Sequence, residues 1–139
     1  MEIKDTLNNQ VLSLIIPEDI LTCFELSDVR ESVDAIELEL RERKDLIPDA
    51  LKGLDVVLDG FCNPLELQSF PLKGKATFIK LYRRRWKQRG TSQHESNQYD
   101  FADSGTKATR MFGAFLKGAF GLTPDTFQHT RDRFMRSRK

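Results

Sequence analysis

The sequence predicts an α+β chain with N-terminal helices, an antiparallel β-sheet of about four to five strands, and two C-terminal helices. Three observations lead to this prediction. Apolar residues recur at helical spacing near the start, period-two alternation follows residue 24, and helical spacing returns after residue 105. The length of 139 residues suits an α+β domain of residues 1–104, with helices in 6–24 and strands in 24–101, followed by a basic helical hairpin of residues 105–139.

The N-terminal helix is expected in two pieces within residues 6–24. The first piece is indicated by apolar residues at helical spacing, namely Leu7, Val11, Leu12, Leu14 and Ile15. Pro17 is expected to open the second, because proline fits the first position of a helix. Glu18 and Asp19 follow it, and carboxylates favour the positive end of the helix dipole.

The clearest strand pattern is the alternation of Ile36, Leu38 and Leu40 with charged residues. Its acids, Glu37 and Glu39, are therefore expected to face solvent. A weaker strand, residues 24–29, is expected to pair with it through a hairpin loop at residues 31–34. Two later apolar runs, residues 56–58 and 65–67, are consistent with a further hairpin or meander.

A turn at residues 70–75, where Gly74 can take a positive φ, leads into the longest predicted strand, residues 76–86. The polar residues 87–98 are expected to form a mobile loop. Residues 99–101 are then expected to form a short returning strand.

Alternation along the long strand places Thr77, Ile79 and Leu81 on a core face. The opposite face interleaves aromatic and basic side chains: Phe78, Lys80, Tyr82, Arg84 and Trp86. Such a face suits nucleic acid, because cations neutralise phosphates and aromatic rings stack on bases. An equally weighted interpretation is an amphipathic outer strand whose arginines are solvated and pair with the acidic N-terminal half.

The first of the two C-terminal helices, after residue 105, is expected to carry a basic stripe opposite its apolar face. Lys107, Arg110 and Lys117 share this stripe, which can follow a DNA backbone but is more often the solvated side of a helix. The hairpin of the last two helices also has a helix-turn-helix outline. In that interpretation the recognition helix presents Thr126, Gln128, His129 and Arg133.

Charge is divided unevenly along the chain. Residues 1–70 carry 6 basic and 16 acidic side chains, a net charge of −10, and residues 71–139 carry 16 basic and 5 acidic ones, a net charge of +11. The total of +1 hides this asymmetry, which favours a polyanionic partner for the second half.

Several classes are excluded by the same composition. No apolar run is long enough for a membrane helix, and the polar start predicts no secretory signal peptide. Cys23 and Cys62 give no disulfide framework and are expected as buried, reduced thiols in a cytoplasmic protein. His94 and His129 are expected at the surface. No nucleophile, metal-ligand spacing or phosphate loop indicates catalysis, a metal or a cofactor, so the chain is predicted not to be an enzyme.

A family resemblance adds to this interpretation. The segment 68–75, the arginine-rich end of the long strand at 83–86, and the segments 105–110 and 112–117 resemble the N-terminal region of bacterial insertion-sequence transposases. Residues 16–21 and 24–26 are similar to the opening of that family. The relatives are short proteins encoded ahead of an acid-triad (DDE) transposase, and the resemblance covers roughly residues 12–117.

The resemblance implies DNA binding at the ends of a mobile element, with strand cutting left to a separate catalytic transposase subunit. Related transposases build this region around a zinc finger, but residues 87–98 contain no cysteine, so no zinc site carries over. The expected DNA-binding residues are Lys80, Tyr82, Arg83, Arg84, Arg85, Trp86, Lys87, Arg89, Lys107, Arg110 and Lys117, with Thr109 adding a hydroxyl contact. The alternative is a protein-interaction module that recruits or dimerises with the transposase without touching DNA, through Phe120, Phe127 and Phe134. A homodimer is a further expectation.

Overall fold

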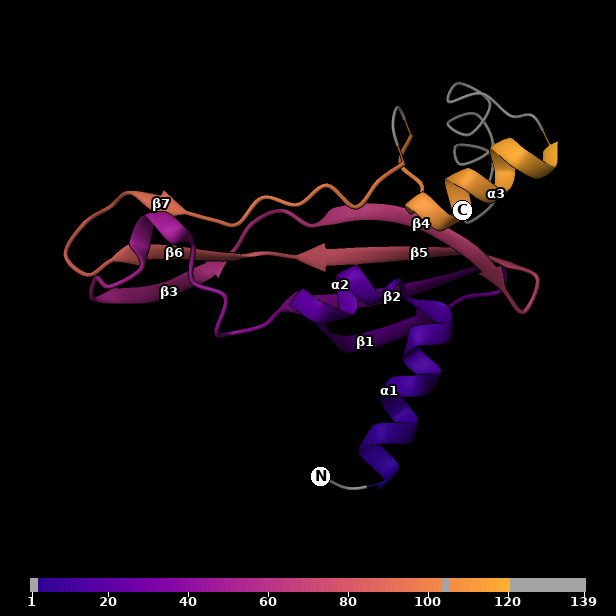
Figure 1. Cartoon of the computed structure of the whole chain (residues 1–139), viewed down its shortest axis with the longest axis horizontal. Coiled ribbons are helices and arrows are strands. Elements are labelled where there is room, and N and C mark those ends of the chain that lie inside the picture. Colours follow the sequence, from indigo (N-terminus) through magenta and orange to yellow (C-terminus); the bar gives the residue numbers. More distant parts are fainter. Residues whose placement is uncertain (1–2, 104–105, 121–139) are drawn as a thin grey trace.

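The computed structural model describes residues 3–103 and 106–120. The described helices are α1 (Ile3–Ile15), α2 (Glu18–Cys23) and α3 (Arg110–Phe120), with a 3-10 turn η1 (Asp49–Leu51). The strands are β1 (Phe24–Glu31), β2 (Ala35–Glu42), β3 (Val56–Phe61), β4 (Leu65–Leu72), β5 (Lys75–Tyr82), β6 (Arg84–Gln88) and β7 (His94–Glu95). They form two sheets, ordered β1-β2-β5-β4 and β3-β6-β7, which follow one another along the long axis (Figure 1). The α+β class is confirmed, whereas the single sheet is wrong.

The two-piece N-terminal helix is confirmed, with the interruption at Pro17. Pro17 lies at the cap before α2 instead of at the first helical position, and Glu18 and Asp19 form the first turn. At this helix start the Ile20 N–H donates to the Pro17 carbonyl at 3.1 Å and to the Asp19 carboxylate at 3.0 Å.

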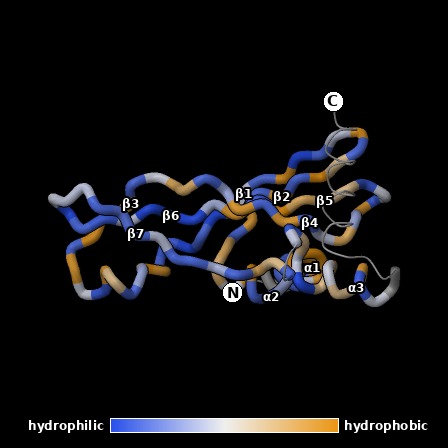
Figure 2. The backbone as a smooth tube through the Cα atoms, turned by 90° about the horizontal axis from the view of Figure 1, so that it is seen from above, coloured by the Kyte–Doolittle hydropathy of each residue, from blue (hydrophilic) through white to orange (hydrophobic). Residues whose placement is uncertain are grey.

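The main core lies between the four-stranded sheet and the helices, which gather on one side of it in Figure 2. Its buried members come from the link between α1 and α2, from α2 and from all four strands: Ile16, Ile20, Phe24, Ile36, Leu38, Leu40, Leu67, Ile79 and Leu81. The predicted core face of the long strand is confirmed at Thr77, Ile79 and Leu81, all fully buried. Burial of this apolar surface is the main source of the fold's stability.

The predicted hairpin of β1 and β2 is confirmed, since Glu31 pairs with Ile36 across a short loop. The neighbour on the other side of β2 is β5, and these two strands run parallel, with Ile36 opposite Thr77. Parallel strands need a long crossover. Residues 43–74 supply that crossover, so the expectation of a purely antiparallel sheet is wrong at this pair.

Because β2 is an inner strand, its alternating acids do not simply face solvent as predicted. Glu37 is only 7% exposed and forms an ion pair with Lys80 of β5 at 3.0 Å. Glu39 is half-buried and pairs with Arg30 of β1 at 3.1 Å. The alternation was correct, but charge pairing across strands covers the second face as well.

The apolar runs at 56–58 and 65–67 do form strands, but these do not pair with each other. β3 joins β6 in the second sheet, and β4 joins β5 in the first. The hairpin predicted from these two runs is therefore wrong. The turn after β4 is confirmed: Lys73 and Gly74 have φ values of 55° and 73°, as a tight two-residue hairpin turn requires.

The long strand predicted at 76–86 is divided between the two sheets. β5 ends at Tyr82 and β6 begins at Arg84, where the Glu42 carboxylate accepts the Arg84 backbone N–H at 2.8 Å. The Cys62 N–H in turn donates to the Arg83 carbonyl at 2.8 Å. These two bonds redirect the chain from the first sheet into the second.

The residues between the second sheet and α3 differ from the prediction. The expected loop 87–98 contains the end of β6 and all of β7. Residues 99–101 form no strand; Tyr99 and Phe101 stack at 5.1 Å between ring centroids and contact Phe24 of the core. The helix expected after residue 105 is confirmed as α3, and the last predicted helix lies outside the described residues.

Candidate nucleic-acid interface

The aromatic members of the predicted DNA-binding strand are not exposed. Trp86 is 5% exposed and Phe78 is fully buried. Tyr82 is half-buried and meets Phe61 edge-on, with 6.3 Å between ring centroids. The prediction that Trp86 offers a stacking surface is therefore wrong, because the second face of the strand is also packed.

Four of the predicted DNA-binding cations are paired with carboxylates of the same chain. Lys80 pairs with Glu37 at 3.0 Å, and Arg89 pairs with Asp55 at 2.9 Å. On the C-terminal side, Arg110 pairs with Asp100 at 3.2 Å and Lys117 with Asp103 at 2.5 Å. The pairs of Lys80 and Arg89 favour the alternative interpretation, in which basic side chains pair with the acidic N-terminal half. The partners of Arg110 and Lys117 belong to the C-terminal half instead.

Three consecutive arginines at the junction of β5 and β6 are held differently. Arg83 donates from Nη1 to the Asn97 carbonyl at 3.2 Å and to the Gln98 side-chain oxygen at 3.1 Å. Arg84 donates from Nε to the Glu42 carbonyl at 2.7 Å, and Arg85 donates from Nε to the Asp59 carbonyl at 2.9 Å. All of these acceptors are neutral. The hydrogen bonds therefore orient the guanidinium groups without forming ion pairs. Arg85 nevertheless lies near enough to the Asp59 carboxylate to help lower its pKa.

Within the described part of the chain, none of the three arginines forms an ion pair with a carboxylate within 4.0 Å. Arg85 is exposed, and Arg83 and Arg84 are half-buried. We refer to Arg83, Arg84 and Arg85 together as the junction arginines.

Glu42 fixes the backbone on which the junction arginines lie. Its side chain is 1% exposed and accepts from the Arg84 N–H, from Asn97 Nδ2 at 2.9 Å and from the Tyr99 hydroxyl. Burial, reinforced by this contact with a carboxylate, raises the pKa of Tyr99. A buried carboxylate with three donors is a well-satisfied anchor.

Arg41 and Phe61 belong to the same surface and were missed by the sequence analysis. The Arg84 guanidinium lies 5.0 Å from the centroid of the Phe61 ring, and the exposed Arg41 guanidinium lies 5.6 Å from the same centroid. Both distances suit cation–π attraction. Arg41 lies near the end of the acidic strand β2, and Phe61 ends β3. Only the pairing of β3 with β6 and of β2 with β5 therefore reveals their proximity.

The remaining predicted contacts are spread over two regions. Lys87 is half-buried on β6, where Val57 and His94 are its strand partners. Lys107 is exposed, and its carbonyl accepts the Gln68 N–H at 2.8 Å. Thr109, expected to offer a hydroxyl, is instead 1% exposed, so that prediction is wrong. The helix-turn-helix residues Thr126, Gln128, His129 and Arg133, and the side chains of Phe120, Phe127 and Phe134, lie outside the described residues.

His94 is confirmed near the surface, where it contacts Asp59. This hydrogen bond is the main cause of the lowered pKa of Asp59, with Lys87 and Arg85 adding smaller effects. Cys23 and Cys62 are only partly buried, contrary to the prediction of buried thiols, and the Cys62 sulfur lies 3.1 Å from the Ser96 hydroxyl.

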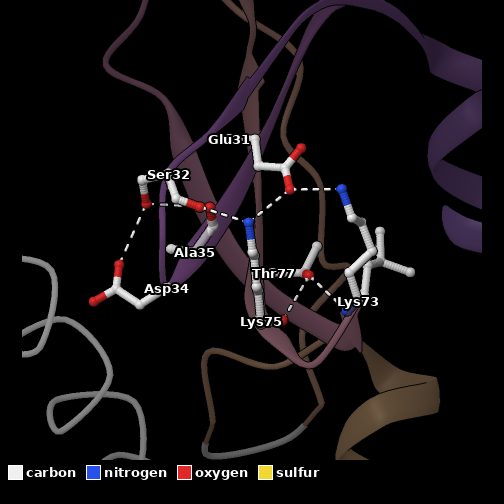
Figure 3. Close-up of polar contacts among 8 residues, drawn as sticks. Glu31, Ser32, Asp34, Ala35, Lys73, Lys75 and Thr77 are labelled. Carbon is white, nitrogen blue, oxygen red and sulfur yellow. Dashed lines mark hydrogen bonds and ion pairs between the residues drawn. The ribbon is translucent and has the colours of Figure 1, made fainter.

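The far end of the four-stranded sheet shows how the basic and acidic halves meet (Figure 3). Lys73 and Lys75 both donate to one oxygen of Glu31, at 2.8 and 2.6 Å, and Lys75 also donates to the Ser32 carbonyl at 2.8 Å. Hydrogen bonds from the two lysines lower the pKa of Glu31 to about 2. The contact clamps the β1–β2 loop to the β4–β5 turn.

Among residues 3–103 and 106–120, no group of three or more His, Cys, Asp or Glu side chains is arranged to hold a metal ion. The helices in the same ranges include none that is long and apolar enough to cross a membrane. Comparison with protein-family models, with curated proteins and with solved structures finds no match to this chain.

Proposed function

We propose that this chain is a non-catalytic DNA-binding accessory part of a transposition system, and that the junction arginines contact the DNA backbone. The transposition context comes from the sequence resemblance. The placement on the molecule is supported by one observation: Arg83, Arg84 and Arg85 are oriented by neutral oxygens, while Lys80, Arg89, Arg110 and Lys117 are paired with carboxylates.

The distinction matters because binding to DNA is driven by neutralising phosphates and releasing their counterions. A cation that is paired with a carboxylate must lose that partner before it can bind a phosphate group of DNA. A guanidinium held by a carbonyl keeps its charge, and its orientation is fixed before binding. Arg85 is the most accessible of the three, and Arg41 adds a fourth charge beside Phe61.

The test is a fluorescence anisotropy titration with a labelled DNA duplex of about 30 base pairs at about 0.1 M salt. The variant Arg41→Gln with Arg85→Gln is expected to bind about tenfold more weakly than wild type, since two phosphate contacts are lost. Its matched control is Arg30→Gln with Lys73→Gln. These two side chains are equally exposed and each pairs with a carboxylate at the other end of the sheet.

An equal loss of affinity in both double variants would reject the junction arginines as the binding site. Binding would then be explained by the overall positive charge of the surface. No binding by the wild type below the ~10⁻⁴ M typical of non-specific DNA binding would reject the proposal itself. A chain that binds the catalytic transposase subunit but no DNA would instead support the alternative, a protein-interaction module.

A further inference from the structure

One exposed aromatic ring lies beside the junction arginines. Phe61 ends β3, where it pairs with Arg84 across the ladder of the second sheet. The Phe61 side chain is 36% exposed, whereas Trp86 on the neighbouring strand β6 is buried. Tyr82 meets the Phe61 ring with 78° between the two ring planes, so these two rings do not stack on each other. Phe61 therefore offers the accessible aromatic surface that Trp86 does not.

The register of the strands brings two guanidinium groups to this ring. Arg41 lies beside Tyr82 in the β2–β5 pair, and Arg84 lies beside Phe61 in the β3–β6 pair. Their guanidinium carbons lie 5.6 and 5.0 Å from the centroid of the Phe61 ring. Within the described part of the chain, neither guanidinium forms an ion pair with a carboxylate within 4.0 Å. We refer to Arg41, Phe61, Tyr82 and Arg84 as the ring cluster.

The nearest acids on the same face of β2 have other partners. Alternation along the strand puts Glu37 and Glu39 on the side of Arg41. Glu37 pairs with Lys80 at 3.0 Å, and Glu39 pairs with Arg30 at 3.1 Å. Towards the junction of the two sheets, this face therefore changes from paired charges to the cations and aromatic rings of the ring cluster.

The chemistry of the ring cluster fits a nucleotide. An apolar protein surface or a lipid tail laid on the ring would also cover the guanidinium groups, and burying a charge without a partner is costly. A nucleotide supplies both partners, since its phosphate oxygens bind guanidinium groups and its base has a flat face for the ring. In a closed duplex only the edges of the bases are accessible in the grooves. An aromatic side chain therefore stacks on a base that is unpaired.

We propose that Phe61 stacks on an unpaired base of the bound DNA, while Arg41 and Arg84 contact the phosphates beside that base. The proposal rests on the proposed function, because it names the form of DNA that the same surface binds. Cation–π attraction is weak at an exposed site, so a phosphate can replace the ring as the partner of Arg41. The chain is therefore expected to bind a duplex that carries a single-stranded segment more tightly than a closed duplex.

Fluorescence anisotropy with two labelled probes tests the proposal. One probe is a blunt DNA duplex of about 30 base pairs, and the other is the same duplex with a single-stranded overhang of about six thymidines. The wild type is expected to bind the overhang probe about tenfold more tightly, because base stacking adds to the phosphate contacts. The overhang also adds phosphates, and Phe61→Leu controls for them because it keeps every charge. This variant is expected to lose most of the tenfold gain and to bind the blunt duplex as wild type does.

The matched control is Phe115→Leu. Phe115 is also an exposed phenylalanine, and it belongs to α3, which lies at the other end of the four-stranded sheet from the junction (Figure 1). Its binding to both probes is expected to equal that of wild type. In a second measurement, Phe61→Trp is expected to keep the tenfold gain. Its fluorescence is expected to be quenched by the overhang probe but not by the blunt duplex, against the constant signal of the buried Trp86.

Equal binding of the two probes by the wild type would overturn the stacking proposal. So would an undiminished gain in Phe61→Leu, or a Phe61→Trp fluorescence that the overhang probe leaves unchanged. Failure of the proposed function gives a different result, because a wild type that binds neither probe below ~10⁻⁴ M rejects DNA binding itself.

Discussion

Gly113 of α3 lies close to Asp103, which precedes the helix in the chain. A Cβ atom built on Gly113 would lie 2.6 Å from the Cβ of Asp103 and 2.7 Å from its Oδ2. We expect Gly113→Ala to lower the free energy of unfolding by about 1–3 kcal/mol, because the clash outweighs the gain in helix propensity. Urea unfolding followed by circular dichroism measures the change.

Gly118 provides the control in the same helix, since a Cβ there would meet no atom within 4 Å. Gly118→Ala is expected to leave stability unchanged or raise it by up to about 1 kcal/mol. If both substitutions stabilise the protein equally, the close approach of α3 to Asp103 is wrong.

The ionisation of the Glu31 carboxyl is expected to make the free energy of unfolding depend on pH. Hydrogen bonds from Lys73 and Lys75 lower its pKa to about 2, from the ordinary value of 4.5. The ionised form therefore stabilises the fold above pH 4.5, and that stabilisation is lost as pH falls from 4.5 to 2. Glu31→Gln is expected to be less stable than wild type at pH 7, and the gap is expected to close across this window.

Urea midpoints of wild type and Glu31→Gln at several pH values test the linkage. Because the contact is solvent-accessible, the gap at pH 7 is also expected to narrow with added salt. Asp45→Asn is the control, an exposed carboxylate that forms no ion pair within the described part of the chain. A gap that is the same at pH 7 and pH 2 would contradict the clamp in Figure 3.

At the scale of elements, the division of residues 76–86 into β5 and β6 is the main departure from the sequence prediction. Alternation correctly assigned the core face of β5, because a period of two is a local property. It could not show that Arg83 marks a change of sheet. That change depends on Glu42 and Cys62, which are distant in sequence.

Trp86 gives the most direct test of this division. Because the side chain is 5% exposed, Trp86→Ala is expected to lower the free energy of unfolding by about 3–5 kcal/mol. Its strand partner Leu58 is 41% exposed, and Leu58→Ala is expected to cost no more than about 1 kcal/mol. If Trp86→Ala leaves stability unchanged, the burial of Trp86 is wrong, and an exposed Trp86 that stacks on bases is favoured again.

At the scale of the whole molecule, some of the opposite charges of the two halves meet inside one fold. Glu31, Glu37 and Asp55 from the acidic half each hold at least one cation from the basic half. The sequence predicted the asymmetry and offered both interpretations of it. It could not show which cations pair with carboxylates and which donate only to carbonyl groups, because composition does not reveal the acceptor that each side chain meets in the fold.

Among the residues predicted to bind DNA, the described structure leaves fewer basic side chains that are exposed and not paired with a carboxylate. The predicted set included the junction arginines but also the buried Trp86 and several neutralised cations. Arg41 and Phe61 complete the surface, and no local pattern could have joined them to Arg84. Local periodicity predicted most elements, whereas the pairing between sheets determined which side chains remain available.

The most direct test of the account is the salt dependence of DNA affinity for wild type and Arg85→Gln. With about 0.9 counterions released per neutralised phosphate, one contact each by Arg41 and the three junction arginines predicts a wild-type slope of log K against log [NaCl] of about −3.6. Arg85→Gln is expected to make the slope shallower by about 0.9. A wild-type slope near zero, or a slope that Arg85→Gln leaves unchanged, would contradict the account.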